Sequence, residues 1–186
     1  MTILPRAPVL TIATLLIVGI VFSLAHAGSG QLPAREGAVP RTTNSVPHIQ
    51  IGAEPVPALS DQLIARVATL PGVDIRATVI SLPGAKGFWL TENVDLAHPD
   101  AIVGGREFAH LHPDGSLHAS LPPDRARDAV KAGWAAPHPW ADQRPGWEGF
   151  VLIYTPRTTA ETEVVFQLVL DGYNYVTGRN HVAPDQ

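Results

Sequence analysis

Apolar residues recur at helical spacing in three parts of the chain and therefore predict three helices. The first is expected over residues 59–70, and the second from Pro122 to Ala132, with Gly133 as its left-handed stop. The third follows Thr158, and the side chains expected to face the core are Val164, Val165, Leu168, Val169 and Tyr173. The residues expected to start these helices are Ser60 or Asp61, Pro122 with Pro123, and Thr158 with Glu161 as a capping box.

Shorter segments between these helices read as β-strands. They are residues 73–80, 87–90, 102–112, 116–121 and 150–154. A turn at Pro83–Gly84 joins the first two strands into a hairpin, and a turn at Pro113–Gly115 joins the next two. The last strand is wholly apolar, which is typical of a central strand. This order of elements predicts an α+β fold in which an antiparallel sheet of about five strands is covered by helices.

The length and composition indicate one folded domain, expected at residues 58–178. Residues 28–57 are rich in Pro, Gly, Ser and Thr and read as a linker or extended arm, and residues 179–186 read as a flexible tail. The apolar run Val9–Ala25 makes residues 1–27 either a signal peptide or a membrane anchor. The small-x-small pattern Ala25–Ala27 fits cleavage after Ala27. Both alternatives place the domain on the non-cytoplasmic side, as a membrane-anchored or a secreted (periplasmic) protein.

The net charge and the residue content exclude several classes of function. The formal net charge is −4, so no basic field supports a nucleic-acid partner. Without cysteine the chain has no disulfide, no thiolate nucleophile and no thiolate metal ligand. The nucleophile elbow of serine hydrolases, the phosphate loop and the dinucleotide fingerprint are also missing from the sequence. Small molecules and other proteins remain as partners.

Three of the eight histidines, at positions 110, 112 and 118, lie within the predicted hairpin. Strand alternation puts His110 and His112 on one face together with Arg106 and Phe108. A three-residue loop at Asp114–Ser116 brings His118 to that face, opposite His112, whereas a two-residue loop at Asp114–Gly115 turns His118 away. The preceding Gly104–Gly105 indicates a bulge or a close backbone approach.

Three imidazoles on one face of a hairpin suit a divalent transition metal, with His110, His112 and His118 as the ligands. A carboxylate ligand is not expected nearby, because Glu107 has the opposite parity and Asp114 lies in the turn. For Glu107 we favour a solvated or ion-paired position on the strand. The alternative to metal binding is a set of histidines bonded to the backbone or to carboxylates in a half-buried sheet.

Several motifs together resemble the luciferase-domain family, which includes the luciferases of bioluminescent fungi and many bacterial proteins. They are Arg106-Glu-x-Ala-His110-x-His112, Leu117-His118, Lys131-Ala-Gly-Trp134-x-x-x-His138-Pro139 and Tyr154-x-Pro156-Arg157, followed by the last helix. The segment Leu32–Gly37 is similar to one that follows the membrane helix of the fungal enzymes, which favours a retained anchor. The turn between His112 and His118 is shorter here than in the fungal proteins.

The resemblance implies oxygen chemistry on an electron-rich enol or phenol, such as the hydroxylated styrylpyrone of the fungal enzymes, with no added cofactor. It does not imply light emission. On this reading His110 or His112 is the base that deprotonates the enol, and His118 and His138 orient it or bond to it. Arg106 or Arg157 would hold the enolate.

Other functions and roles stay open at this stage. A metal-dependent enzyme or metal-binding protein would use the same three histidines, and a membrane-tethered small-molecule binding module would need them only for structure. The four tryptophans, Trp89, Trp134, Trp140 and Trp147, are expected in the core or at its rim. The loop at 135–149 holds two of them and His138, so it could instead cover a flat aromatic ligand.

Overall fold

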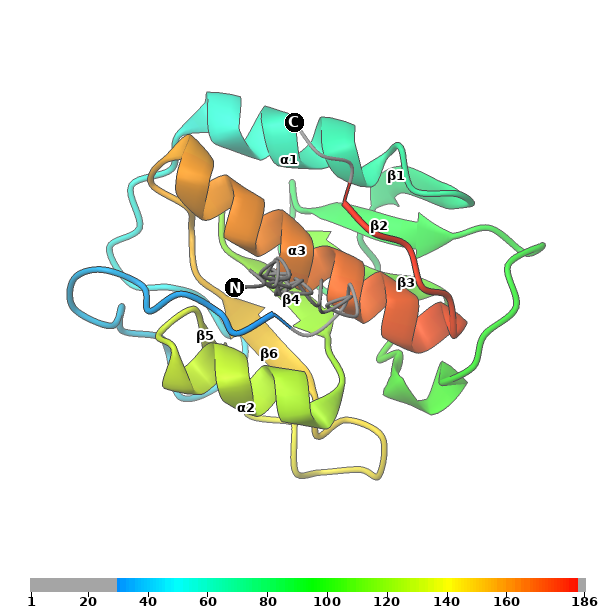
Figure 1. Cartoon of the computed structure of the whole chain (residues 1–186). Helices are drawn as coiled ribbons and strands as arrows, with labels where there is room; N and C mark the ends of the chain where they lie inside the picture. The colour runs from blue at the N-terminus through cyan, green and yellow to red at the C-terminus, as the bar shows by residue number, and fades with distance from the viewer. Residues whose placement is uncertain (1–29, 184–186) are drawn as a thin grey trace, which may run out of the picture.

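The computed structural model describes residues 30–183, which form a six-stranded sheet and three α-helices (Figure 1). The elements are α1 (Pro57–Val67), β1 (Val73–Ala77), β2 (Lys86–Leu90), a 3₁₀ turn (Pro99–Ala101), β3 (Glu107–Leu111), β4 (Leu117–Ser120), α2 (Pro123–Lys131), β5 (Ala135–Pro137), β6 (Phe150–Ile153) and α3 (Thr159–Thr177). Within these residues no helix is long and apolar enough to cross a membrane. The apolar run Val9–Ala25, and with it the signal or anchor, lies outside the described residues.

The strands are antiparallel throughout and follow the order β1-β2-β3-β4-β6-β5. Both predicted hairpins are present, and β6 lies between two strands with all four of its residues buried, as its apolar sequence predicted. The sixth strand, β5, was missed. It is three residues long, lies at the sheet edge and ends at Pro137, so it offers no alternation to detect.

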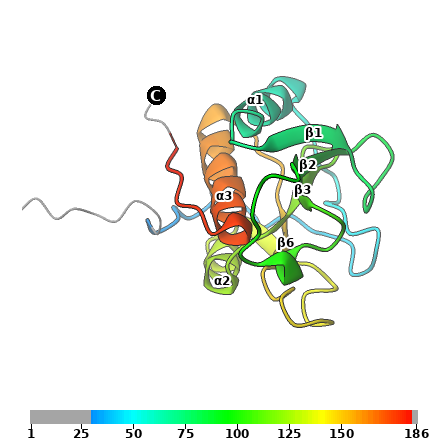
Figure 2. The same cartoon turned by 90° about the vertical axis from the view of Figure 1, so that its right-hand side faces the viewer.

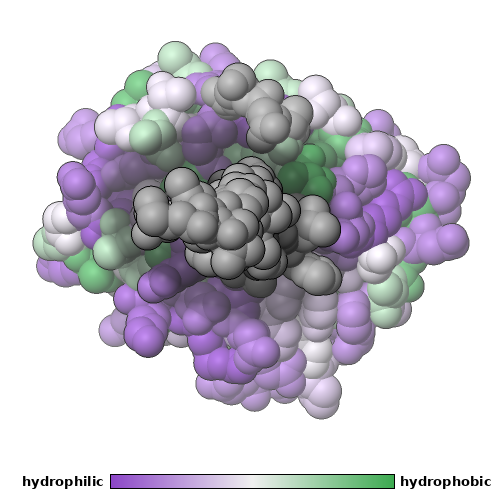
Figure 3. Space-filling model, viewed as in Figure 1, coloured by the Kyte–Doolittle hydropathy of each residue, from purple (hydrophilic) through white to green (hydrophobic). Residues whose placement is uncertain are grey.

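All three helices lie on the same side of the sheet (Figure 2). Helix α3 crosses β3 and β4, with α1 and α2 on either side of it (Figure 1). Their apolar faces enclose the core, in which Phe88, Phe108, Leu168 and Tyr173 are almost fully buried. Seen from the helical side, the surface outside the grey residues is mainly hydrophilic, with scattered hydrophobic patches (Figure 3).

Two of the three helices begin at the residues that the sequence predicted. Thr158 caps α3 by accepting a hydrogen bond from the Glu161 amide at 3.1 Å. Pro122 and Pro123 open α2, and Gly133 follows its end with a φ of 82°. The expected caps of α1 were wrong: that helix begins earlier, at Pro57, whose fixed φ suits a first helical position without a side-chain cap.

A β-bulge in β3 changes which side chains face the helices. Trp89 pairs with Glu107 and Phe88 pairs with Ala109, so Phe108 is an extra residue without a partner on β2. Its ring packs in the core against Phe88 and Tyr173, at centroid distances of 6.3 Å and 5.9 Å. The expectation that Phe108 shares a face with the histidines was therefore wrong.

Residues 30–56 contain neither helix nor regular strand, yet they lie along the domain and contact it at several points. The indole of Trp134 donates to the Pro33 carbonyl at 2.6 Å, and the Thr155 amide donates to the Gln50 side chain at 3.0 Å. Further along, this segment reaches the side of the sheet opposite the helices (Figure 2). We call residues 30–56 the arm.

Candidate functional site: a buried histidine cluster

The β3–β4 hairpin brings its three histidines to one face. The amide of His112 donates to the Ser116 carbonyl at 2.8 Å, so the loop is the three-residue turn Pro113–Gly115. His110 then lies directly opposite His118. A three-residue loop and a shared face were one of the two predicted registers. The loop begins one residue earlier than predicted, so the partner of His118 moves by two residues, from His112 to His110.

Two more histidines complete the group. His138 follows β5, and its ring centroid lies 4.8 Å from that of His118. His48 comes from the arm and lies 5.1 Å from the His138 ring. All five rings are at most 5% exposed. They line a cavity of about 400 Å³, which we call the histidine cavity. Its other walls are Val46, Pro47, Ile80, Ser81, Leu82, Trp140 and Phe150.

Glu107 belongs to this cluster, contrary to the prediction from strand parity. The bulge at Phe108 puts Glu107 on the same face as His110, and its carboxylate lies 2.9 Å from Nδ1 of His110. The residue is 2% exposed. Gly87 leaves room for it, because a Cβ at that position would come within 3.0 Å of the Glu107 carboxyl carbon.

Hydrogen bonds fix which nitrogen of His110 carries the proton. The Glu107 carboxylate already accepts from the Thr78 hydroxyl at 2.7 Å and from the Val79 amide at 3.0 Å. It therefore acts as an acceptor towards His110 as well, so Nδ1 of His110 donates. The Nε2 atom of His110 is left with its lone pair.

The ring of His112 is fixed in the same way. Its Nδ1 lies 3.0 Å from the Ser116 hydroxyl, which donates its own hydrogen to Asp114 at 2.7 Å. The hydroxyl must accept from His112, and Nε2 of His112 also keeps its lone pair. Among residues 30–183 no hydrogen bond engages that atom.

His138 has the opposite arrangement. Its Nδ1 accepts the Trp140 amide hydrogen at 3.0 Å, so in the neutral ring Nε2 carries the proton and is a donor. His118 lies between two other rings. Its Nδ1 is 3.0 Å from Nε2 of His110, and its Nε2 is 3.2 Å from Nδ1 of His48.

Burial keeps these imidazoles uncharged. Loss of solvation, with repulsion from neighbouring histidines, lowers the pKa of His112 to about 4 and that of His138 to about 3. The same causes hold the pKa of His118 well below its usual value, and burial lowers the pKa of His48. At neutral pH these four rings therefore present lone pairs and N–H groups to the cavity rather than imidazolium charges.

The two predicted arginines are elsewhere. The guanidinium of Arg106 donates to the carbonyls of Leu90 at 3.0 Å and Thr91 at 2.9 Å, and to that of Val94. Its role is to hold the chain after β2. No arginine or lysine of the described chain lines the histidine cavity.

Arg157 is half exposed and pairs with Glu161 and with the Glu36 carbonyl. The Glu161 hydrogen bond raises the pKa of the Arg157 guanidinium. This carboxylate explains a cation next to the N-terminus of α3. Neither arginine is placed to hold a substrate anion in the histidine cavity.

The tryptophans divide between core and cavity. Trp134 and Trp147 are buried, and the half-buried Trp89 donates its indole hydrogen to the Ala77 carbonyl at 3.2 Å. Trp140 lines the histidine cavity and stacks on Trp147, with ring centroids 6.1 Å apart. The segment after β5 therefore forms one wall of the cavity through His138 and Trp140.

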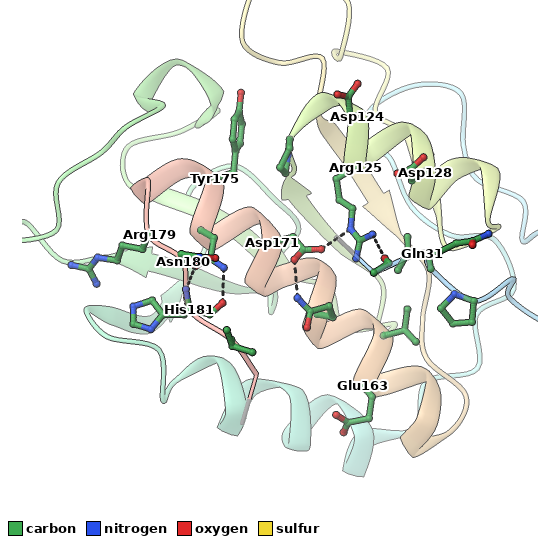
Figure 4. A pocket seen from close by; sticks show the side chains of 18 residues that line it. Gln31, Asp124, Arg125, Asp128, Glu163, Asp171, Tyr175, Arg179, Asn180 and His181 are labelled. Atoms are coloured by element: carbon green, nitrogen blue, oxygen red, sulfur yellow. Dashed lines mark hydrogen bonds and ion pairs between the residues drawn. The ribbon is translucent and has the colours of Figure 1, made fainter. Parts of the chain in front are cut away.

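A second cavity of about 750 Å³ lies on the helical side, between α2, α3, the start of the arm and residues 179–182 (Figure 4). Its central charges are already paired. Arg125 donates to Asp171 at 2.6 Å and to the Gly30 carbonyl at 3.0 Å, and Gln167 donates to Asp171 at 2.8 Å. We call this cavity the helical groove.

Comparison with known proteins identifies the family. A model of the family described as "Luciferase domain" matches residues 105–170. The proteins named "Luciferase" from Armillaria gallica and Armillaria mellea are each 30% identical over 167 residues, covering 78% of this chain and 61% of the relative. That from Neonothopanus nambi is 35% identical over 78 residues, covering 39% of this chain and 28% of the relative.

Residues 105–170 thus match the luciferase-domain family, and most of the chain is similar to the fungal luciferases. It spans about 61% of the length of its Armillaria relatives. No solved structure matches it significantly. The matched region runs from β3 into α3 and contains His110, His112, His118 and His138, whereas His48 lies outside it.

Two residues of the cluster were not found from the sequence. Glu107 was set aside because strict alternation puts it on the other face, and only the bulge reverses that. His48 was passed over because its segment reads as a linker. The signal available was its setting among Val46, Pro47, Ile49 and Ile51, an apolar stretch in an otherwise polar arm.

Proposed function

We propose that this luciferase-domain protein is a small-molecule oxygenase that takes an enolic or phenolic, pyrone-like substrate and O2 in the histidine cavity. The observation that carries the proposal is the convergence of five buried histidines on a cavity of about 400 Å³ with apolar and aromatic walls. A flat ring fits between such walls, and polar atoms at one end would orient it. Family membership supports oxygen as the second substrate.

The chemistry starts from the enolate, because an enol reacts with O2 once it has lost its proton. A carbon of the enolate supplies the electrons for a new bond to O2, which is reduced to the level of a peroxide. The lost proton returns to the outer peroxide oxygen, so the hydroperoxide contains all atoms of the substrate and of O2. The unprotonated Nε2 of His112, which no hydrogen bond engages among residues 30–183, can hold that proton in the interval.

His138 has a defined role in this proposal. Its Nε2–H is fixed as a donor by the Trp140 amide and belongs to a ring that lines the cavity. A preorganised donor of this kind stabilises an enolate oxygen in a site from which water is excluded. The proposal includes neither an organic cofactor nor light emission.

The test is oxygen uptake by the full-length protein with a panel of hydroxypyrones and related enols, run with and without added divalent metal. We expect uptake with at least one enol, and we expect His138→Ala to lower turnover about 10²-fold to 10³-fold. His98→Ala is the matched control, because that ring is exposed and stacks on Tyr175 outside the cavity. Enol binding without oxygen uptake in every condition would overturn the oxygenase and leave a binding module.

A further inference from the structure

The lining of the histidine cavity includes no arginine or lysine of the described residues that could balance an enolate. The predicted guanidinium groups bind elsewhere. What the cavity does offer is a set of buried nitrogen lone pairs. Lone pairs without a matching donor are the donor set of a metal site.

We propose that His110, His112 and His118 bind one divalent transition-metal ion at the base of this cavity. One ligand nitrogen from each of these rings lies within 4.8 Å of the others, and all three rings are buried. Neutral imidazole suits Zn²⁺, Fe²⁺, Cu²⁺ and Ni²⁺. Three protein ligands leave coordination positions open for a substrate, as catalytic metal sites require.

The bonds around two of the rings support this set. His110 donates through Nδ1 to the Glu107 carboxylate, and His112 donates through Nδ1 to Ser116, which is itself bonded to Asp114. Metal-ligating histidines ordinarily donate their second ring nitrogen to a carboxylate or another acceptor, which fixes the tautomer. Both rings are therefore held with Nε2 unprotonated; that of His110 faces Nδ1 of His118, and that of His112 has no hydrogen-bond partner among residues 30–183.

His118 supplies the third nitrogen through Nδ1, which lies 3.0 Å from Nε2 of His110. Two ligands of a single ion are separated by a distance of this order, since each lies about 2 Å from the metal. The proton of His118 would then sit on Nε2, where Nδ1 of His48 accepts it at 3.2 Å. Every ring of the trio would thus have an acceptor for its second nitrogen.

A second group of three histidines, His48, His118 and His138, also has ligand nitrogens within 4.8 Å of one another but is less suited to a metal ion. The Trp140 amide donates to Nδ1 of His138 and so leaves the proton on Nε2. A metal on that Nε2 would push the proton to Nδ1, against the amide hydrogen. His138 therefore stays a hydrogen-bond donor, and the ion is assigned to His110, His112 and His118 of the β3–β4 hairpin. That the ion would balance an enolate rests on the proposed function, whereas its binding does not.

The test is metal binding by the full-length protein after removal of metals with a chelator and reloading with Co²⁺ or Zn²⁺. Mass spectrometry of the desalted protein should find about one ion per chain, and the visible spectrum of bound Co²⁺ should report imidazole ligation. His112→Gln and His110→Gln should abolish this binding. His138→Gln and His98→Gln should keep it. Circular dichroism of each variant separates loss of the site from loss of the fold.

Two milder variants keep the test decisive if a ligand variant fails to fold. Glu107→Gln removes the negative charge beside His110, and Ser116→Ala removes the acceptor of His112. Both leave all three ligands in place, so each should weaken binding about 10-fold to 100-fold. The absence of bound metal in the wild-type protein would overturn the inference. So would an equal loss in His138→Gln and His112→Gln. Because no substrate is used, neither result depends on finding the oxygenase activity.

Discussion

The two cavities of this molecule contrast in how their polar groups are satisfied. The helical groove is larger and carries formal charges, but its buried carboxylate and guanidinium already bind one another. The histidine cavity is smaller and is lined by no arginine or lysine of the described residues, yet it contains the Nε2 lone pair of His112, which no donor among residues 30–183 matches. Size and charge would favour the groove as the site. The hydrogen-bond partners favour the histidine cavity, and they are the better guide to chemistry.

The largest expected effect comes from breaking the pair in the helical groove. Arg125→Met should lower the free energy of unfolding by about 3–5 kcal/mol, because it leaves the buried Asp171 without its cation. Denaturant unfolding measures this, and metal content should not change. The double variant Arg125→Met/Asp171→Leu should recover much of the loss. A single variant as stable as the wild type would show that the groove is not held by this pair.

Removing the carboxylate of the histidine cluster should have the next largest effect on stability. Glu107→Ala leaves the buried Nδ1 of His110 and the part-buried donors of Thr78 and Val79 without their acceptor, and we expect a loss of about 2–4 kcal/mol in metal-free protein. Chemical denaturation of both proteins tests it. Glu92→Ala is the control, since that side chain is 93% exposed. A loss no larger than that of the control would contradict the buried network.

The neutral histidines predict a sensitivity to acid. The pKa of His112 is lowered in the folded protein, so between about pH 6.5 and pH 4 the unfolded chain binds a proton that the native ring does not. Stability should fall with pH in that range, by about 1.4 kcal/mol per pH unit for each such histidine. Thermal unfolding of metal-free protein from pH 7 to pH 4 shows it. His112→Gln should flatten the slope, and an unchanged slope would argue against a neutral His112.

The smallest effect is expected at Arg106, whose predicted role was catalytic. Arg106→Met removes donors to three backbone carbonyls, with an expected loss of about 1–2 kcal/mol in the free energy of unfolding. Metal affinity and any turnover should stay within about twofold of the wild type, since the guanidinium does not line the cavity. A much larger fall in turnover with unchanged folding would return this residue to the active site.

Local patterns predicted the elements well because the signals were strong. The capping box at Thr158 and the apolar periodicity after it defined α3, and the turn at Pro113–Gly115 defined the central hairpin. Strand β5 was missed for lack of such a signal. The start of α1 was misplaced because Ser60 and Asp61, which are typical capping residues, lie inside the helix, which begins at Pro57.

The site was only half predictable for a different reason. Alternation along β3 grouped His110 with His112, and these stay together because both lie beyond the bulge. Upstream of Phe108 the same rule put Glu107 on the wrong face. His48 is 70 positions from His118, and only the fold brings the two together. Composition gave no hint that the arginines of the motifs bind backbone carbonyls and a neighbouring glutamate.

The arm has a practical consequence. A shortened protein that starts at the first helix would keep every strand and every helix described here, along with four of the five clustered histidines. It would nevertheless lose His48 and the cavity wall at Val46 and Pro47. Negative results from such a truncated form would reflect an opened pocket. The smallest unit worth testing in the laboratory therefore begins upstream of the regular secondary structure.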